Sequence, residues 1–204
     1  MINSDSDDSF PSYGYAKVNG TLVDPNPAIR LLAETFPNNF ADWIKDQGNV
    51  MWLPTDVYQI PTIVNHLDIH YGDTLFELGS GDCRVLAGAF ILSGGRISCV
   101  GYEKRPSLLE YSRRKLKILG LEDRIKVERV DFFKDDLSGL SEATKVYLYL
   151  SSTPNWELEE PLLKYLPNGA IVLSKSFAMS PNWDKFCALK SESYPEYFKY
   201  RIRK

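Results

Sequence analysis

From about residue 74, short apolar runs alternate along the chain with amphipathic stretches. Continuous apolar runs are typical of buried strands, and apolar residues three or four positions apart are typical of helices. The pattern predicts strands at residues 74–78, 97–103, 125–130, 143–150 and 170–174, and helices at residues 84–92, 107–119 and 156–165. Repeated strand–helix–strand units predict an α/β domain with helices on both faces of a parallel sheet. Residues 184–202 can add two strands that return as a hairpin.

The pattern before residue 74 is weaker. Residues 1 to about 25 lack periodicity, which predicts irregular chain, and short helices are expected at residues 27–34 and 40–44. Thr55 is expected to cap a further helix that Pro61 kinks or splits. We therefore predict an N-terminal extension, residues 1–47, made of a partly disordered tail and short helices, followed by the main domain, residues 48–204.

Composition narrows the possible functions. The 204 residues include 44% hydrophobic ones, enough for a core, and the formal net charge of -3 argues against general affinity for nucleic-acid phosphates. The acidic, polar start does not resemble a signal peptide, and no apolar run approaches the roughly 20 residues that span a bilayer. The three cysteines form no CxxC pair, so no disulfide framework and no metal site are expected. These features favour a soluble cytoplasmic protein and leave its oligomeric state open.

The segment TLFELGSGDCR, residues 74–84, places two glycines between a predicted strand and a predicted helix. Gly79 permits a tight turn, and Gly81 lets a ligand approach the backbone where a Cβ would block it. This arrangement is typical of nucleotide-type binding at the carboxyl end of a strand. Glu77, two positions before the first glycine, could accept a hydrogen bond from the ammonium group of a ligand. A strand–helix turn without a ligand is the structural alternative.

Two further carboxylates end the next two predicted strands. Glu103 follows the glycines by about 20 residues, a spacing at which an acid can bind both hydroxyls of a ribose. Asp131, followed by Phe132, could bind the amino group of an adenine and pack against its ring, or could simply cap the next turn. The carboxyl ends of parallel strands lie at one edge of a sheet. Glu77, Glu103 and Asp131 are therefore predicted to share a rim that one adenosyl-amino-acid ligand spans.

The segments TLFELGSGDCR, VGYEKRP and RVDFF resemble the first three motifs of class I, seven-strand S-adenosylmethionine-dependent methyltransferases. Two longer segments, GNVMWLPTD before the first strand and GYEKRPSLLEYSRRKLKILG after the glycine-rich segment, make the resemblance narrower. With them, the chain is similar to the small archaeal and mitochondrial protein-lysine methyltransferases. The resemblance implies a Rossmann-like three-layer sandwich. Its mostly parallel seven-stranded sheet would include an antiparallel C-terminal hairpin strand, and a short helical extension would precede it. The resemblance also implies S-adenosylmethionine as cofactor and a lysine of a protein as methyl acceptor.

The same resemblance implies roles for individual residues. It assigns the methionine end of the cofactor to Glu77, Gly79, Ser80, Gly81 and Asp82, the ribose to Glu103, the adenine to Asp131 and Phe132, and a covering segment to Pro54 and Thr55. The chain departs from the family at Cys83, where glycine is usual. It also lacks, at residues 149–155, the Asn/Asp-Pro-Pro-aromatic motif of enzymes that methylate planar amide or adenine nitrogens. The second departure weighs against nucleic-acid bases and glutamine as substrates.

Tyr149, Ser151 and Ser152 follow the fourth predicted strand, and their position makes them the candidates for orienting the methyl acceptor. Burial in an aromatic channel would lower the pKa of a lysine amine, so this reaction needs no dedicated general base. Trp52, Tyr149, Trp156 and Trp183 could each line such a channel or belong to the core. Two alternatives stay open: a methyltransferase acting on RNA or a small molecule, and a binding module that kept the fold without the activity.

Overall fold

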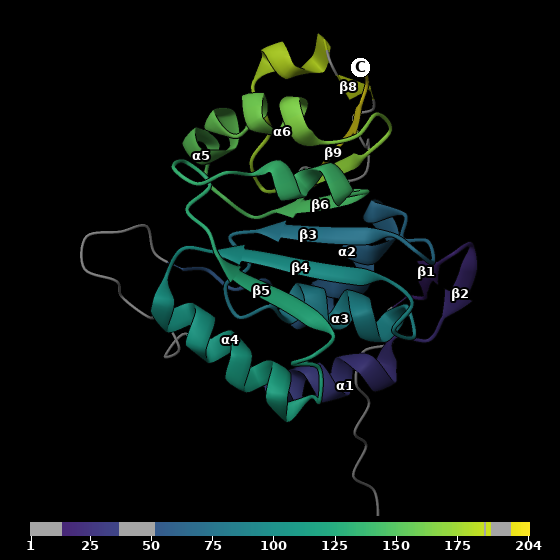
Figure 1. The fold of residues 1–204 in the computed structure, drawn as a ribbon. Helices are drawn as coiled ribbons and strands as arrows, with labels where there is room; N and C mark the ends of the chain where they lie inside the picture. The colour runs from purple at the N-terminus through teal and green to yellow at the C-terminus, as the bar shows by residue number, and fades with distance from the viewer. Residues whose placement is uncertain (1–13, 37–51, 186, 189–196) are drawn as a thin grey trace, which may run out of the picture.

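The computed structural model describes residues 14–36, 52–185, 187–188 and 197–204, and these residues form a three-layer α/β structure around one large sheet (Figure 1). The sheet has seven strands within the described residues, in the order β5-β4-β3-β6-β7-β9-β8. Strands β3 to β7 pair in parallel, whereas β9 is antiparallel to both β7 and β8. The strands are β3 (Thr74–Leu78), β4 (Ser98–Glu103), β5 (Ile125–Arg129), β6 (Lys145–Leu148), β7 (Ile171–Lys175), β8 (Cys187–Ala188) and β9 (Tyr197–Ile202). The predicted fold class is confirmed.

Alternate residues of the strands point to opposite faces of the sheet and belong to two separate apolar cores. Helices bury each core, so both faces of the sheet are covered. Leu75 belongs to the core that contains side chains of α1, α2, α3 and α4, and Phe76 belongs to the core that contains side chains of α6. Val146 and Tyr147 alternate in the same way on β6. The helices are α1 (Asn26–Thr35), α2 (Ile60–Leu67), α3 (Arg84–Leu92), α4 (Pro106–Ile118), α5 (Ser152–Glu157) and α6 (Glu159–Tyr165).

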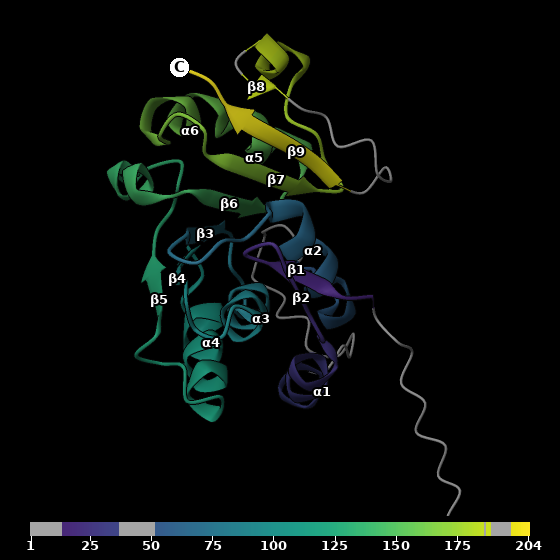
Figure 2. The same cartoon turned by 90° about the vertical axis from the view of Figure 1, so that its right-hand side faces the viewer.

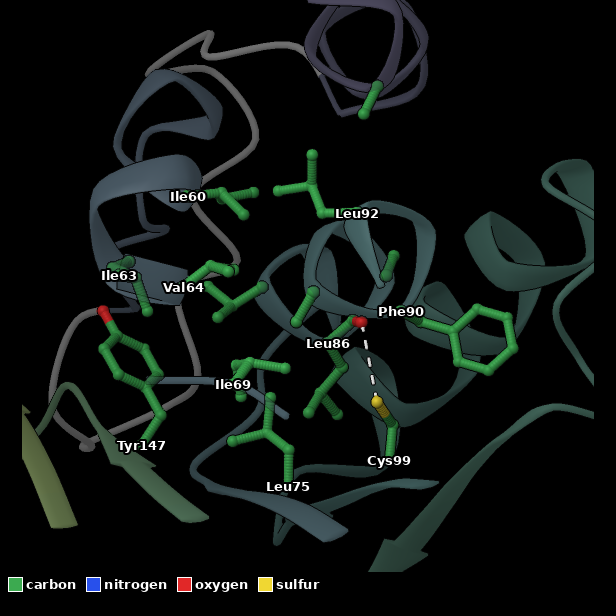
Figure 3. Packing of buried hydrophobic residues seen from close by; sticks show 14 of the residues in the cluster. Ile60, Ile63, Val64, Ile69, Leu75, Leu86, Phe90, Leu92, Cys99 and Tyr147 are labelled. Atoms are coloured by element: carbon green, nitrogen blue, oxygen red, sulfur yellow. Dashed lines mark hydrogen bonds between the residues drawn. The ribbon is translucent and has the colours of Figure 1, made fainter. Parts of the chain in front are cut away.

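The first core positions the glycine-rich turn. Ile60, Ile63 and Val64 of α2 pack in one cluster with Leu86 of α3 and Leu75 of β3 (Figure 3). Helices α2 and α3 approach closely, since a Cβ on Gly88 would lie 2.6 Å from Cγ2 of Ile60. This packing fixes α3, which begins directly after the turn between β3 and the helix.

The N-terminal region contains a hairpin where the sequence analysis predicted irregular chain. Strands β1 (Ala16–Val18) and β2 (Thr21–Val23) pair in antiparallel fashion beside α2 (Figure 2). Asn19 and Gly20 form the turn with φ of 50° and 77°, which suits a two-residue hairpin turn. Ala16 and Val18 are fully buried, and the backbone N–H of Asn19 donates to the carbonyl of Ile69 (2.7 Å). The hairpin is thus part of the core.

Other predicted boundaries need correction. Asp56 rather than Thr55 caps the helical segment, because its Oδ1 accepts from the backbone N–H of Tyr58 (3.0 Å), and a 3-10 turn, η2 (Val57–Gln59), precedes α2. The helix predicted at residues 156–165 begins earlier and divides into α5 and α6 at Leu158. Pro161 explains this division, since it has no N–H to donate to the carbonyl of the preceding turn. The helix predicted at residues 40–44 lies outside the described residues.

Candidate cofactor-binding and active site

A cavity of about 450 Å³ lies at the carboxyl ends of β3, β4, β6 and β7. Parallel α/β sheets bind ligands at this edge, and cofactor pockets commonly have volumes of roughly 300–1,000 Å³. Most predicted cofactor residues line it: Pro54, Thr55, Glu77, Gly79, Ser80, Asp82, Glu103 and Phe132. Among the predicted acceptor residues, Tyr149 and Ser151 line it as well. The structure thus brings to one cavity residues that were chosen from segments far apart in the chain.

The glycine-rich turn forms the floor of the cavity next to β3. Gly79 and Gly81 have φ of 79° and 54°, in the region that glycine adopts without strain. The backbone N–H groups of Gly79 and Ser80 both donate to the carbonyl of Tyr102 on β4 (2.8 and 3.0 Å). A Cβ on Gly81 would overlap Nε1 of Trp52, so this glycine makes room for the Trp52 ring, and Gly81 itself does not line the cavity. Trp52, which was open as a wall or a core residue, lines the cavity.

Cys83, the departure from the family pattern, lies at the end of this turn. Its φ is 65°, a left-handed conformation in which side chains other than glycine are strained. The usual glycine at this position therefore has a backbone explanation. The thiol is fully buried, and burial raises its pKa well above the ordinary value. A buried, protonated thiol fits packing rather than nucleophilic chemistry.

Glu103 joins the end of β4 to the glycine-rich turn. Its side chain is 4% exposed, Oε2 accepts from the backbone N–H of Gly81 (3.0 Å), and Oε1 accepts from the backbone N–H of Arg105 (2.9 Å). A carboxylate offers about four lone-pair positions, so these two bonds leave acceptor capacity for a neighbouring diol. Two backbone N–H groups thus hold the Glu103 carboxylate in a fixed orientation at the cavity.

Glu77 is a buried carboxyl group with unused acceptor capacity. Its side chain is 6% exposed, and Oε2 has no hydrogen-bond partner among the described residues. Burial raises the pKa of Glu77 well above its ordinary value, and the charges of Asp82 and Glu103 raise it further. A cationic group placed here would supply the missing partner and stabilise the ionised carboxylate. The site therefore fits the ammonium group of an amino-acid ligand.

Asp82 has a partner that the sequence analysis missed. Arg84 donates from Nε to both carboxylate oxygens (3.0 Å each) and from Nη2 to Oδ2 (2.7 Å), and both side chains are almost fully buried. Nη1 of Arg84 also donates to the carbonyl of Thr55 (3.1 Å), and the hydroxyl of Thr55 lies 3.2 Å from that of Tyr147. This network fastens the Pro54–Thr55 segment to the glycine-rich turn. The sequence signal was an arginine at the start of a helix, two residues after an aspartate.

Asp131 does not line the cavity. It lies in an adjoining depression of about 700 Å³ together with Lys104, Arg105, Arg129 and Lys134. Its Oδ1 accepts from the backbone N–H of Phe133 (3.2 Å), which is the turn-capping arrangement left open above. The neighbouring Phe132 and Phe133 do line the cavity. Two of the three predicted carboxylates thus share the cavity, and the binding of adenine by Asp131 stays a prediction.

The opposite end of the cavity, next to β6 and β7, holds the candidate acceptor residues. Tyr149 and Ser151 line it, whereas Ser152 is the first residue of α5 and does not. Nζ of Lys175 lies 4.3 Å from the centre of the Tyr149 ring and donates to Oε1 of Gln59 (2.5 Å). Ser176 and Phe177, which directly follow β7, complete this end. Neither residue was among those predicted from the sequence.

Trp156 and Trp183 lie elsewhere, in a separate depression beside α6. No group of three or more His, Cys, Asp or Glu side chains that could hold a metal ion occurs in the part of the chain that the structure describes. None of the described helices combines the length and the apolar character that crossing a membrane requires.

Comparisons with known proteins agree with this geometry. The model of the ANTKMT methyltransferase domain family matches residues 77–186, which is more than half of the chain. An RNA methyltransferase from Salinibacter ruber, crystallised with S-adenosyl-L-homocysteine, is 29% identical and has a TM-score of 0.64. The alignment covers 74% of this chain and 95% of that chain.

More distant solved structures share the fold. An S-adenosylmethionine-dependent O-methyltransferase from Thermotoga maritima is 14% identical, with a TM-score of 0.56 and coverage of 74% of this chain and 67% of that chain. A precorrin-6y C5,15-methyltransferase from Geobacter metallireducens is 14% identical, with a TM-score of 0.55 and coverage of 79% and 90%. No curated protein sequence matches the chain. The chain belongs to the ANTKMT methyltransferase domain family and is an S-adenosylmethionine-dependent methyltransferase.

Proposed function

We propose that the enzyme methylates the ε-amine of a lysine in a protein. The observation that carries this proposal is the lining of the cavity next to β6 and β7, which consists of Tyr149, Leu150, Ser151, Pro154, Ser176 and Phe177. These residues provide aromatic rings, apolar surface and hydroxyl groups, and they include no carboxylate and no imidazole. Such a lining suits a lysine side chain, whose aliphatic part is apolar and whose amine must be neutral to attack.

Desolvation in this part of the cavity would lower the pKa of the incoming amine and favour its neutral form. Bound S-adenosylmethionine supplies the electrophile, a methyl group attached to a positively charged sulfur. The task of the protein is to align the amine with that methyl group and to exclude water. We assign the orientation of the amine to the hydroxyls of Tyr149 and Ser151, with Ser152 as a less direct candidate.

We further propose how the cofactor lies across the cavity. Glu77 would pair with its ammonium group, and Glu103 would accept hydrogen bonds from the ribose hydroxyls. Phe132 would pack against the adenine, with Asp131 at the edge of that ring. Gly79, Ser80, Gly81 and Asp82 would line the methionine end, and Pro54 and Thr55 would cover the ligand. The orphaned Oε2 of Glu77 and the acceptor capacity of Glu103 support this orientation.

A protein acceptor has two further supports. The sequence resembles the small protein-lysine methyltransferases over most of the chain, and the overall charge of -3 does not favour nucleic acid. RNA is the second candidate, favoured by the similarity to the Salinibacter ruber RNA methyltransferase and by the four cationic side chains in the depression beside Asp131.

We also keep as proposals a catalytic domain at residues 48–204 and a location in the cytoplasm, where buried free thiols such as Cys83 and Cys99 stay reduced.

Radiolabelled methyl transfer to a cell extract tests this function. The purified enzyme and methyl-labelled S-adenosylmethionine are incubated with the extract, which is then digested with protease or with RNase. The proposal predicts label that protease releases and RNase leaves, and methyl-lysine after acid hydrolysis. Label released by RNase would overturn it in favour of RNA. The Gly81→Ala variant, in which a Cβ would overlap Trp52, serves as the inactive control.

A further inference from the structure

The chain makes an unusual turn directly after β7, at the acceptor end of the cavity. The backbone N–H of Phe177 donates to the carbonyl of Lys175 (2.8 Å), and Ser176 between them has a φ of 65°. This hydrogen bond and this dihedral angle define a γ-turn with a positive φ, which is rare and strained. Strained backbone of this kind persists where surrounding contacts hold it, and it is concentrated at functional sites.

Asn155 of α5 holds the turn from the neighbouring crossover. Its side chain is fully buried, and Nδ2 donates to Oγ of Ser174 (3.0 Å) and to the carbonyl of Phe177 (2.9 Å). Oγ of Ser174 donates to the same carbonyl (2.6 Å). Oδ1 of Asn155 has no hydrogen-bond partner among the residues that the structure describes. The fold thus tolerates both a strained residue and a buried orphan acceptor to keep this turn in place.

The turn sets one wall of the cavity. The ring of Phe177 lines the cavity and is 38% exposed, so it lies between the interior and solvent. The ring of Tyr149, which directly follows β6, contacts Nζ of Lys175, the residue that begins the same turn. The end of β7 therefore positions two aromatic residues, Tyr149 and Phe177, that line this end of the cavity.

We propose that Phe177 is a specificity-determining residue that packs against the aliphatic carbons of the acceptor lysine, and that Asn155 is the positioning residue that holds it there. This inference rests on the proposed lysine acceptor. The aliphatic part of a lysine side chain needs an apolar wall of this kind, while its amine proceeds toward the methyl group. A smaller or displaced side chain at position 177 leaves those carbons in contact with water.

A pair of ligands tests the proposal without knowledge of the natural substrate. The first is S-adenosyl-L-homocysteine. The second is its analogue with nitrogen in place of sulfur and a butylamine arm on that nitrogen, which imitates the lysine side chain. Calorimetry gives the ratio of the two dissociation constants. The native enzyme should bind the analogue more tightly, and Phe177→Ala should reduce this advantage about tenfold, the effect of losing roughly two buried methylene contacts.

Four variants complete the design. Ser174→Ala, which removes a hydrogen bond to the carbonyl of Phe177, should reduce the preference for the analogue partly. Phe177→Leu, which keeps an apolar side chain, should retain most of that preference. Trp156→Ala removes a similarly exposed ring (52%) outside the cavity and should leave the ratio unchanged. Phe133→Ala removes an exposed ring (41%) at the proposed adenine end and should weaken the binding of both ligands equally.

The outcomes separate the two proposals. If the butylamine arm adds no affinity in the native enzyme, the proposed lysine acceptor is wrong, and this inference is wrong with it. If the arm adds affinity that Phe177→Ala leaves intact, the lysine acceptor stands and the role of Phe177 is overturned. A reduction by Phe177→Ala that Phe177→Leu does not restore would also contradict the role of an apolar wall.

Discussion

The buried pair of Asp82 and Arg84 gives the sharpest prediction for stability. Both side chains are almost fully buried, and Arg84 makes three side-chain hydrogen bonds to Asp82 and one to the carbonyl of Thr55. Asp82→Ala leaves a guanidinium in the interior without its carboxylate. Breaking a buried pair in this way costs about 3–5 kcal/mol, which is a large part of a typical free energy of unfolding of about 5–15 kcal/mol.

The double variant Asp82→Ala/Arg84→Met is the matched control. It removes both charges and keeps an unbranched apolar side chain at position 84, so its cost should lie well below the sum of the two single changes. Urea unfolding followed by circular dichroism measures all four proteins. The reasoning is refuted if Asp82→Ala costs less than about 1 kcal/mol, or if the two single costs simply add.

Three further predictions concern the cofactor site. Glu103→Gln replaces a carboxylate that accepts from two backbone N–H groups. It should weaken the binding of S-adenosyl-L-homocysteine, measured by calorimetry, about 10- to 100-fold, and unchanged affinity would contradict the assigned role. The raised pKa of Glu77 means that the folded protein holds a proton that the unfolded chain releases near its ordinary value of 4.5. The free energy of unfolding should therefore fall as pH rises above that value, and Glu77→Gln should flatten this slope in urea titrations at several pH values. Gly81→Ala should abolish methyl transfer because its Cβ would overlap Trp52. Gly169→Ala, which has the same sign of φ and nothing within 4 Å of its Cβ, should cost stability and leave activity intact.

The sheet and its flanking helices could be predicted because burial on both faces leaves a regular record in the sequence. Strand β3 matches its predicted limits, and α3 does as well. The hairpin of β1 and β2 was missed because strands of three residues are too short to show a period. The pair Asn19-Gly20 was a usable signal, since this dipeptide favours the turn that joins two hairpin strands.

The location of a candidate site residue was predictable where it follows from the residue's place near a strand end. Glu77 is the penultimate residue of β3 and Glu103 is the last residue of β4, so the parallel pairing of these strands brings both to the same edge of the sheet. Asp131 lies in the adjoining depression because β5 ends at Arg129 and the Asp131 side chain accepts from the backbone of the turn that follows. The tie from Arg84 to Thr55 joins residues 29 positions apart and depends on how α2 and α3 pack.

Phe177 lies beyond prediction from sequence for a different reason. Its position depends on a hydrogen bond from Asn155, in the connection between β6 and β7, to the carbonyl of Phe177, which follows β7. The segment around Ser176 contains no glycine, so the sequence gives no indication of a positive φ there. Such a turn becomes visible only when the backbone dihedral angles are known.

A crystal structure with S-adenosyl-L-homocysteine bound tests the central claim most directly. The claim is that Glu77 holds the ammonium group and Glu103 holds the ribose of one adenosyl-amino-acid ligand inside the cavity beside the glycine-rich turn. We predict the ligand's ammonium group within hydrogen-bond distance of Oε2 of Glu77, and its ribose hydroxyls on Glu103. A ligand bound in another orientation, or outside this cavity, would contradict the account.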